Sequence, residues 1–334
     1  MIDTPRQLHV PLLCSVGPTA SGKTALAQAV AERLKGVVLS ADSMQVYRGM
    51  DIGTSKIEPE QRTVPYYGLD IASPQEAYSA SRFQDYARAV INDLDTQKTP
   101  CVICGGTGFY VRAVIDDFVF PPGEQVGNEI RDYYMHMAQQ QGPQAVLDAL
   151  NSLDPDSAAV IPVNDVRRAV RALEMHQEGT SYAHQKEEFA HIEAFYTPIC
   201  MIGLAVDSDI LRARIDARVE AMIEEDLVLE VQSLIDQGFH DALTAKVAIG
   251  YKDIIDVIDG KIALPEAVEH MKVATHRYAK RQRTWFKKDA RIQWLNANQI
   301  EDQACLNKLV DSVVDMYSCA CESTACKGAS HGTE

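Results

Sequence analysis

The stretch LLCSVGPTASGKTALAQAVAERL (12–34) contains Gly17, Gly22, Lys23 and Thr24 at the spacing of a phosphate-binding loop. Such a loop has glycines where backbone N–H groups turn toward a phosphate, a lysine for the terminal phosphates and a hydroxyl for Mg²⁺. The apolar residues 8–16 before it predict a buried strand, and apolar residues recur at helical spacing after it. This order places a helix N-terminus under a bound anion. The flanking elements therefore favour a phosphate site over a Gly/Ser-rich turn that binds nothing.

Length and composition indicate a globular protein. The chain has 334 residues, which suggests about two domains, and 46% of them are hydrophobic. Its apolar runs are too short to span a membrane and its first residues lack an apolar signal region, so we expect a cytoplasmic protein. Eight cysteines in a chain of this length do not indicate a disulfide scaffold.

The charge of the chain is acidic overall and basic in two places. A net charge of −15 argues against general adhesion to nucleic acid. Residues 277–288, however, carry six basic side chains and no acid, and residues 167–171 carry three arginines. Each segment is either a local basic surface or a solvated helix face with scattered counter-charges.

Alternating strand and helix patterns predict an α/β fold, a P-loop NTPase-like parallel sheet flanked by helices, with an inserted helical domain. Further strands are expected at 36–42, 101–104, 197–206 and 291–296, and helices at 81–94, 109–115, 208–237 and 299–317. Residues 1–120 and 197–317 form the predicted catalytic core. Residues 121–196 are polar with a helical pattern and form the predicted insert, and residues 318–334 are expected to be a disordered tail.

Side chains at the carboxyl ends of strands are the first candidates for chemistry, because ligands of open parallel sheets bind there. The phosphate loop follows one strand, Asp42 the next and Thr107 a third, so the three are expected to converge on one crevice. Asp42 is a Mg²⁺ ligand, a general base or a turn residue, and its spacing leaves these alternatives open. Arg214 and Arg218, four apart on a helix, form either a solvated face or a pair that holds a diphosphate.

The cysteines suggest burial more than chemistry. Cys101 and Cys104 form a C-x-x-C in an expected strand, where side chains three apart point to opposite faces. Two buried thiols are therefore expected there instead of a metal or redox pair. The tail residues Cys319, Cys321, Cys326 and His331 could bind a metal, although no packed core is expected around them.

Six segments of the chain carry a resemblance to a known family. They are GPTASGKT (17–24), DSMQVYRGMDIGTSK (42–56), GGTGFY (105–110), NDVRRAVRALE (164–174), AIGYKD (248–253) and RYAKRQRTWF (277–286). In this order they resemble the tRNA dimethylallyltransferases, also called tRNA isopentenyltransferases, from about residue 8 to about residue 296. The second segment is much more specific than the phosphate loop, which many unrelated proteins share.

The resemblance implies an enzyme that transfers a dimethylallyl group from dimethylallyl diphosphate to N6 of the adenosine just 3′ of a tRNA anticodon. Asp42 is then the general base that takes the N6 proton, and Thr107 lies beside the acceptor nucleotide. Lys23, Arg218 and a Mg²⁺ held partly by Thr24 would neutralise the departing diphosphate. The implied partners are the tRNA anticodon stem-loop and dimethylallyl diphosphate, and the protein is expected to act as a monomer.

The family's binding residues carry over to positions of this chain. Diphosphate binding is implied for Gly17, Pro18, Thr19, Ala20, Ser21, Gly22, Lys23 and Thr24. Contact with tRNA is implied for Asp42, Ser43, Met44, Gln45, Thr107, Arg131, Arg167, Arg168, Arg171, Lys280, Arg281, Gln282 and Arg283. Trp285 is expected either to stack on a base or to lie in the core. The chain departs from the family pattern at Val247, where Gln or Arg is frequent, and at Asp226, where glycine is usual.

Other uses of the phosphate loop stay open at this point. A related transferase would take a free adenine nucleotide as acceptor, although the helical insert and the basic residues 277–288 favour a polynucleotide. A small-molecule kinase would use the same loop and consume ATP. A GTPase-type switch ranks lowest, because the one Asn-Lys pair, Asn307-Lys308, lacks the aspartate of the base-reading motif.

Overall fold

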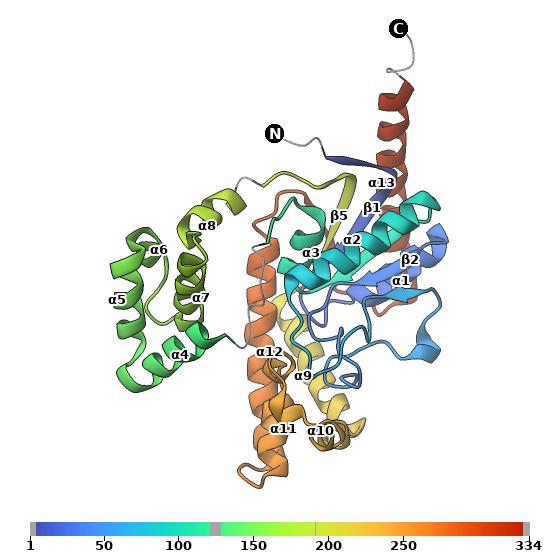
Figure 1. Cartoon of the computed structure of the whole chain (residues 1–334). Coiled ribbons are helices and arrows are strands. Elements are labelled where there is room, and N and C mark those ends of the chain that lie inside the picture. The colour runs from blue at the N-terminus through green and yellow to red at the C-terminus, as the bar shows by residue number, and fades with distance from the viewer. Residues whose placement is uncertain (1–4, 121–127, 191, 330–334) are drawn as a thin grey trace. The chain divides into compact units, whose positions relative to one another are not determined.

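The computed structural model describes residues 5–120, 128–190 and 192–329, without the side chains of residues 190 and 323–329. The chain divides into two compact units, one of Met1–Asp116 with Ala194–Glu334 and the other of Asp117–Glu193. The first unit contains the sheet, and the elements of the second are helices (Figure 1). The second unit lies where the helical insert is predicted.

The first unit is built on a six-stranded parallel sheet in the order β3-β2-β4-β1-β5-β6. The strands are β1 (Arg6–Val16), β2 (Val37–Ser40), β3 (Tyr66–Tyr67), β4 (Cys101–Gly105), β5 (Tyr196–Ala205) and β6 (Ile292–Asn296). The predicted parallel α/β sheet is confirmed. Only β3 was not expected, because a strand of two residues has no periodicity to detect. Since β2, β4 and β1 are neighbours, their carboxyl ends meet at one edge of the sheet.

Helices cover both faces of this sheet. On one face α1 (Lys23–Leu34) and α13 (Gln303–Ala329) pack around Leu13, and on the other α2 (Ala80–Thr96) and α3 (Gly108–Ile115) pack around Leu12. Successive strand side chains point to opposite faces, so both leucines are buried although the two clusters are separate. Cys101 and Cys104 divide between the clusters in the same way, as predicted. Burial raises the pKa of the Cys101 thiol to about 12 and that of Cys104 to about 11.

The single helix expected at 208–237 is two helices, α9 (Ser208–Glu224) and α10 (Leu227–Asp236). The break lies at Asp226, whose φ of 67° is in the left-handed region. Aspartate is one of the few non-glycine residues that adopt this conformation readily. The prediction was wrong because the apolar spacing continues across the break and does not report the backbone angle.

The C-terminal helix is longer than predicted. α13 ends at Ala329, so the expectation of a disordered tail from residue 318 is wrong for residues 318–329. Val313 and Tyr317 are buried against the sheet, and Cys321 packs partly buried against the same cluster. This packing extends the helix past the end of the apolar pattern. Two of the possible metal ligands in the tail, Cys326 and His331, lie outside the described side chains.

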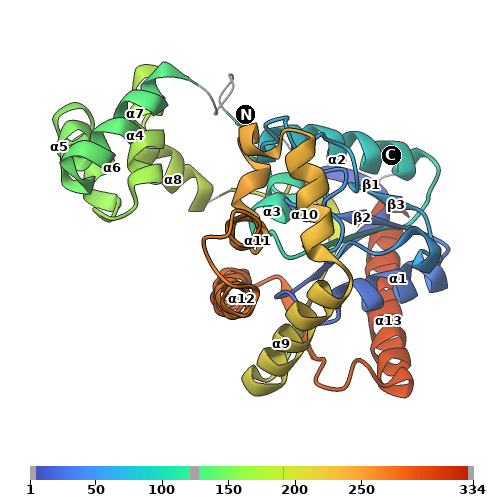
Figure 2. The same ribbon diagram turned by 90° about the horizontal axis from the view of Figure 1, so that it is seen from below.

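Helices α11 (Tyr251–Ile258) and α12 (Leu264–Phe286) complete the first unit and pack with α9 and α10 (Figure 2). Short 3₁₀ turns occupy Pro59–Gln61, Phe239–Asp241 and Ala245–Val247. None of the helices in the described part of the chain has the length and apolar character that a membrane span requires.

The second unit consists of α4 (Glu129–Gln141), α5 (Pro143–Leu153), α6 (Pro155–Val160), α7 (Val166–Gln177) and α8 (Tyr182–Ala190). Its own small core includes Val146, Leu150, Val170 and Leu173. The carboxylates of Asp154 and Asp165 accept backbone N–H bonds at the start of α6 and α7, so local capping helps to define these short helices.

Candidate functional site

A cavity of about 870 Å³ opens at the carboxyl edge of the sheet. Three segments line most of it: the phosphate loop, residues of the segment 42–58, and the face of α9 from Arg218 to Glu225. Asp42 and Lys23 both line this cavity, as the strand-end argument predicts. Thr107 is not among the lining residues, but its hydroxyl bonds to Ser43, the residue after Asp42.

The phosphate loop has the conformation that its sequence predicts. Gly22 precedes α1 with a φ of 88°, which disfavours any other residue there. Lys23 begins the helix, and its Nζ donates to the carbonyl oxygen of Pro18 at 3.3 Å. Burial lowers the pKa of Lys23, and the charge of Arg218 lowers it further, whereas Cys104 and Asp42 oppose the shift. A partly buried cation that lines a cavity is suited to receive an anion.

Arg218 lies at the cavity and Arg214 does not. Arg218 Nη1 donates to the Thr19 hydroxyl at 3.4 Å, and burial lowers the pKa of its guanidinium, with Glu225 opposing the shift. Arg214 instead donates to the carbonyl oxygens of Ala297 and Asn298 at 3.2 and 2.9 Å, and its Nε lies 2.7 Å from Glu301. The idea of a diphosphate-holding pair is therefore wrong for Arg214, whose guanidinium links α9 to the segment after β6.

Asp42 and Thr107 follow the neighbouring strands β2 and β4. Asp42 Oδ1 accepts from the N–H of Met44 at 2.9 Å, and the residue lines the cavity. The Thr107 hydroxyl accepts from the N–H of Ser43 at 3.1 Å and lies 3.3 Å from the Ser43 hydroxyl. The structure thus brings Asp42 and Thr107 together through one turn, 42–44.

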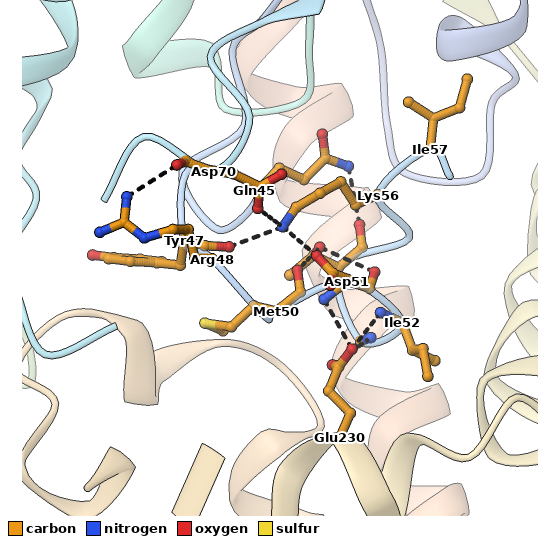
Figure 3. A network of polar contacts seen from close by, with 12 residues as sticks. Gln45, Tyr47, Arg48, Met50, Asp51, Ile52, Lys56, Ile57, Asp70 and Glu230 are labelled. Atoms are coloured by element: carbon orange, nitrogen blue, oxygen red, sulfur yellow. Dashed lines mark hydrogen bonds and ion pairs between the residues drawn. The ribbon is translucent and has the colours of Figure 1, made fainter. Parts of the chain in front are cut away.

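Residues of the segment 45–57 line the cavity, and a network of polar contacts connects this segment (Figure 3). Lys56 is 6% exposed; its Nζ donates to the carbonyl oxygen of Tyr47 at 2.9 Å and to Asp70 Oδ1 at 2.6 Å, and it also contacts Asp51. Gln45 lines the cavity and bonds within the protein with both ends of its amide; its contact with tRNA stays a prediction. It accepts from Ser40 Oγ at 2.9 Å and donates to the carbonyl oxygen of Thr54 at 3.1 Å.

Glu230 of α10 holds the middle of the same segment (Figure 3). Its carboxylate accepts from the backbone N–H groups of Asp51, Ile52 and Gly53 at 2.9, 2.7 and 3.2 Å. The Tyr251 hydroxyl donates to the same carboxylate at 2.7 Å. Sequence reasoning missed Lys56, Glu230 and Tyr251 as site residues. Lys56 and Tyr251 do belong to two of the quoted segments, which was the available signal.

Helix α12 shows two different faces within its basic stretch. Lys280 and Arg281 are exposed, Arg283 is half-buried with its guanidinium 3.1 Å from the Ser208 hydroxyl, and Gln282 is only 5% exposed. Gln282 accepts from the N–H of Thr19 at 2.8 Å and donates to the carbonyl oxygen of Gly106 at 2.9 Å. Its predicted contact with tRNA does not agree with this burial. Trp285, 42% exposed, lies outside the core.

Two of the four arginines predicted to contact tRNA from the insert form ion pairs with a glutamate of their own unit. Arg131 makes a two-pronged ion pair with Glu174 at 2.7 and 2.9 Å, and Arg171 Nη1 lies 3.3 Å from the same carboxylate. Burial alone would raise the pKa of Glu174, but the bonds from Arg131 and Arg171 hold it below its usual value. Arg167 and Arg168 are exposed, and Arg168 pairs with Asp165 at 3.0 Å. They are the freer cations of this surface.

The polar groups at the phosphate loop fit a magnesium ion carried with a diphosphate. Among the described residues there is no cluster of three His, Cys, Asp or Glu side chains that would form an all-protein metal site. Mg²⁺ does not need one, because it commonly takes one or two protein ligands and completes its shell with substrate phosphates and water. The Thr24 hydroxyl lines the cavity beside Lys23 and can supply such a ligand.

Known proteins resemble this chain over most of its length. The model of the IPP transferase family matches residues 45–289. A tRNA dimethylallyltransferase of Geobacillus thermodenitrificans is 41% identical over 291 residues, covering 86% of this chain and 90% of that protein. One from Carboxydothermus hydrogenoformans is 39% identical over 310 residues, covering 91% and 96%.

Two solved structures are similar as well. The full-length tRNA isopentenylpyrophosphate transferase from Bacillus halodurans matches with a TM-score of 0.70 and 37% identity, over 96% of this chain and 99% of that one. A eukaryotic dimethylallyltransferase acting on tRNA matches in fold with a TM-score of 0.72 at 24% identity, over 88% and 75%.

Proposed function

The chain belongs to the IPP transferase family, that of the tRNA dimethylallyltransferases, and from this premise we propose which groups perform the transfer. It is an enzyme that prenylates tRNA. We propose dimethylallyl diphosphate as donor, and as acceptor N6 of the adenosine just 3′ of the anticodon. The observation that supports this most is the cavity itself, which Lys23, Arg218 and Asp42 line together.

The phosphate loop is proposed to hold the donor's diphosphate. The loop Gly17–Thr24 leads into the N-terminus of α1, and Lys23 and Arg218 add two partly buried positive charges. As the allylic C–O bond breaks, negative charge grows on the leaving diphosphate, and these groups stabilise it. Thr24 would hold a Mg²⁺ ion, which when bound supplies further charge neutralisation at the diphosphate.

Asp42 is proposed as the general base for the acceptor. The lone pair of adenine N6 is delocalised into the ring, so N6 needs orientation and loss of a proton as the new N–C bond forms. Asp42 lines the cavity and its carboxylate can take that proton, while Thr107 and Ser43 fix the turn that carries it. The balanced products are N6-dimethylallyl-adenosine in tRNA and diphosphate.

Basic side chains are proposed to bind the anticodon stem-loop. Lys280 and Arg281 on α12 and Arg167 and Arg168 on α7 are exposed and can reach phosphates. A base that reacts at N6 has to leave its stack, so the acceptor adenosine is flipped out of the loop toward Asp42. We propose that a monomer in the cytoplasm carries out this reaction.

The competing transfer reactions are less favoured. Neither a free adenine nucleotide as acceptor nor phosphoryl transfer from ATP agrees with the family of the chain. The test is transfer of label from dimethylallyl diphosphate to a tRNA with adenosine next to the anticodon, with Mg²⁺ and without ATP. Label on this tRNA, and not on a control with guanosine at that position, is expected. Label on free AMP, or consumption of ATP without transfer, would contradict the proposal.

A further inference from the structure

The side chain of Gln282 connects two loops that contribute different parts of the site. Its Oε1 accepts from the N–H of Thr19 in the phosphate loop at 2.8 Å, and its Nε2 donates to the carbonyl oxygen of Gly106 at 2.9 Å. The residue is 5% exposed, so both bonds are shielded from water. A buried amide whose two ends are satisfied in this way has one well-defined orientation.

Gly106 and Gly108, between the end of β4 and the start of α3, make room for the approach of α12. A Cβ at Gly106 would lie 2.3 Å from Gln282 Nε2, and a Cβ at Gly108 would lie 2.1 Å from the ring of Trp285. Neither glycine has a positive φ, so their conformation alone does not require glycine. The close approach of α12 explains both positions.

Thr19 is held from a second side. Arg218 of α9 donates to its hydroxyl at 3.4 Å, while Gln282 of α12 accepts from its backbone N–H. On the other side of Gln282, the loop that contains Gly106 carries Thr107, whose hydroxyl orients the turn of Asp42. The chain of contacts from phosphate loop to Asp42 therefore passes through the amide of Gln282.

We propose that Gln282 is a positioning residue that fixes the phosphate loop relative to the Thr107–Asp42 side of the site. This inference rests on the proposed function, because Gln282 would fix the position of the donor's diphosphate relative to Asp42, the base that takes a proton from the acceptor. Gln282 lies between Arg281 and Arg283 in sequence, but its role is internal, not contact with tRNA. Small errors in such alignment are costly, since about 1 Å of misplacement can lower a rate about 10²-fold.

The test compares Gln282→Met, which keeps the size of the side chain and removes both bonds, with the unchanged protein. Single-turnover transfer with both substrates saturating is expected to slow roughly tenfold or more, while the Kd for tRNA stays within about twofold. A raised Kd with an unchanged rate would overturn the proposal, because Gln282 would then be a tRNA contact. Unchanged rate and Kd together would also overturn it.

A double-mutant cycle of Gly106 and Gln282 distinguishes a positioning role from general damage to the fold. Gly106→Ala displaces the Gln282 amide, so it should slow transfer about as much as Gln282→Ala does. In the double variant, Gly106→Ala with Gln282→Ala, the new Cβ occupies the space that the Gln282 amide has left. The transfer rate of this variant should be no lower than that of either single variant. If the fold-decreases in transfer rate of the two single variants multiply in the double variant, the proposal is overturned. This comparison remains informative if Gln282→Met folds poorly.

Two controls distinguish the possible failures. Gln232→Met on α10 replaces a surface glutamine whose side chain bonds to Asp236, and it should transfer at the normal rate. If the unchanged protein does not prenylate tRNA at all, the proposed function fails. If it does so and the Gln282 and Gly106 variants keep the full rate, only the positioning role fails.

Discussion

Asp42 occupies a turn that would persist without its charge. Asparagine can still accept the bond from the N–H of Met44, so Asp42→Asn should keep the local fold but be unable to take the proton from N6. We expect the single-turnover rate to fall by about 10²–10⁴-fold, with little change in the Kd for tRNA. Asp311→Asn, at an exposed ion pair on α13, is the matched control. A normal rate for Asp42→Asn would remove its assignment as the base.

The charge of Lys23 is expected to serve ligand binding while it lowers the stability of the folded protein. Burial lowers its pKa, which means that the empty protein holds a desolvated ammonium group at a cost. Lys23→Met should therefore leave the Tm of the ligand-free protein equal or higher. The same variant should lose most of the rise in Tm that Mg²⁺ and inorganic diphosphate give the unchanged protein. A lower Tm without ligand, together with a normal rise on adding diphosphate, would contradict this interpretation.

At the level of elements, the junction of α9 and α10 depends on one backbone angle. Asp226 adopts a φ of 67°, where glycine is unstrained and a β-branched residue is strongly disfavoured. We expect Asp226→Gly to leave the free energy of unfolding nearly unchanged and Asp226→Val to lower it by about 1–2 kcal/mol. Urea unfolding of the two variants measures the difference. Equal stability of both variants would show that the break is not set by this angle.

Helix α12 combines a buried face and an exposed face within residues 279–286. Ala279, Gln282 and Phe286 are buried, while Lys280 and Arg281 are exposed. One helix therefore both completes the site from inside and presents charge to a polyanion. Helical geometry therefore divides the basic run between two environments, which the sequence of charges alone does not report.

For the whole molecule, a net charge of −15 means that attraction for tRNA has to be local. Changing Lys280 and Arg281 to glutamine should reduce the slope of log K for tRNA against log salt by about two units, roughly one for each phosphate contact. Filter binding over a series of salt concentrations measures this. The charge-matched control changes Lys35 and Lys98 to glutamine. Both lysines are exposed and lie just before β2 and β4, at the amino ends of the strands. Equal slopes for both double variants would place the contact elsewhere.

The sequence by itself determined the α/β class, five of the six strands and the meeting of the phosphate loop with Asp42. These features follow from local signals: apolar periodicity, glycine spacing, and the rule that parallel strands present their carboxyl ends at one edge. The break at Asp226, the extension of α13 and the internal use of Gln45 and Gln282 did not follow. The extension of α13 and the bonds of Gln282 depend on contacts between residues far apart in the chain. The break at Asp226 depends on a backbone angle, and the bonds of Gln45 to Ser40 and Thr54 depend on the fold of one segment, neither of which apolar periodicity reports.

Only the tertiary structure decided which charged and polar side chains are free. Arg218 and Arg214 lie one helical turn apart, yet the first faces the cavity and the second bonds to the segment after β6. Arg131 and Arg171 both form ion pairs with Glu174, whereas Arg167 is exposed. A sequence names the group and its charge, but burial and the nearest partner set whether that charge can act on a ligand, and both are properties of the folded chain.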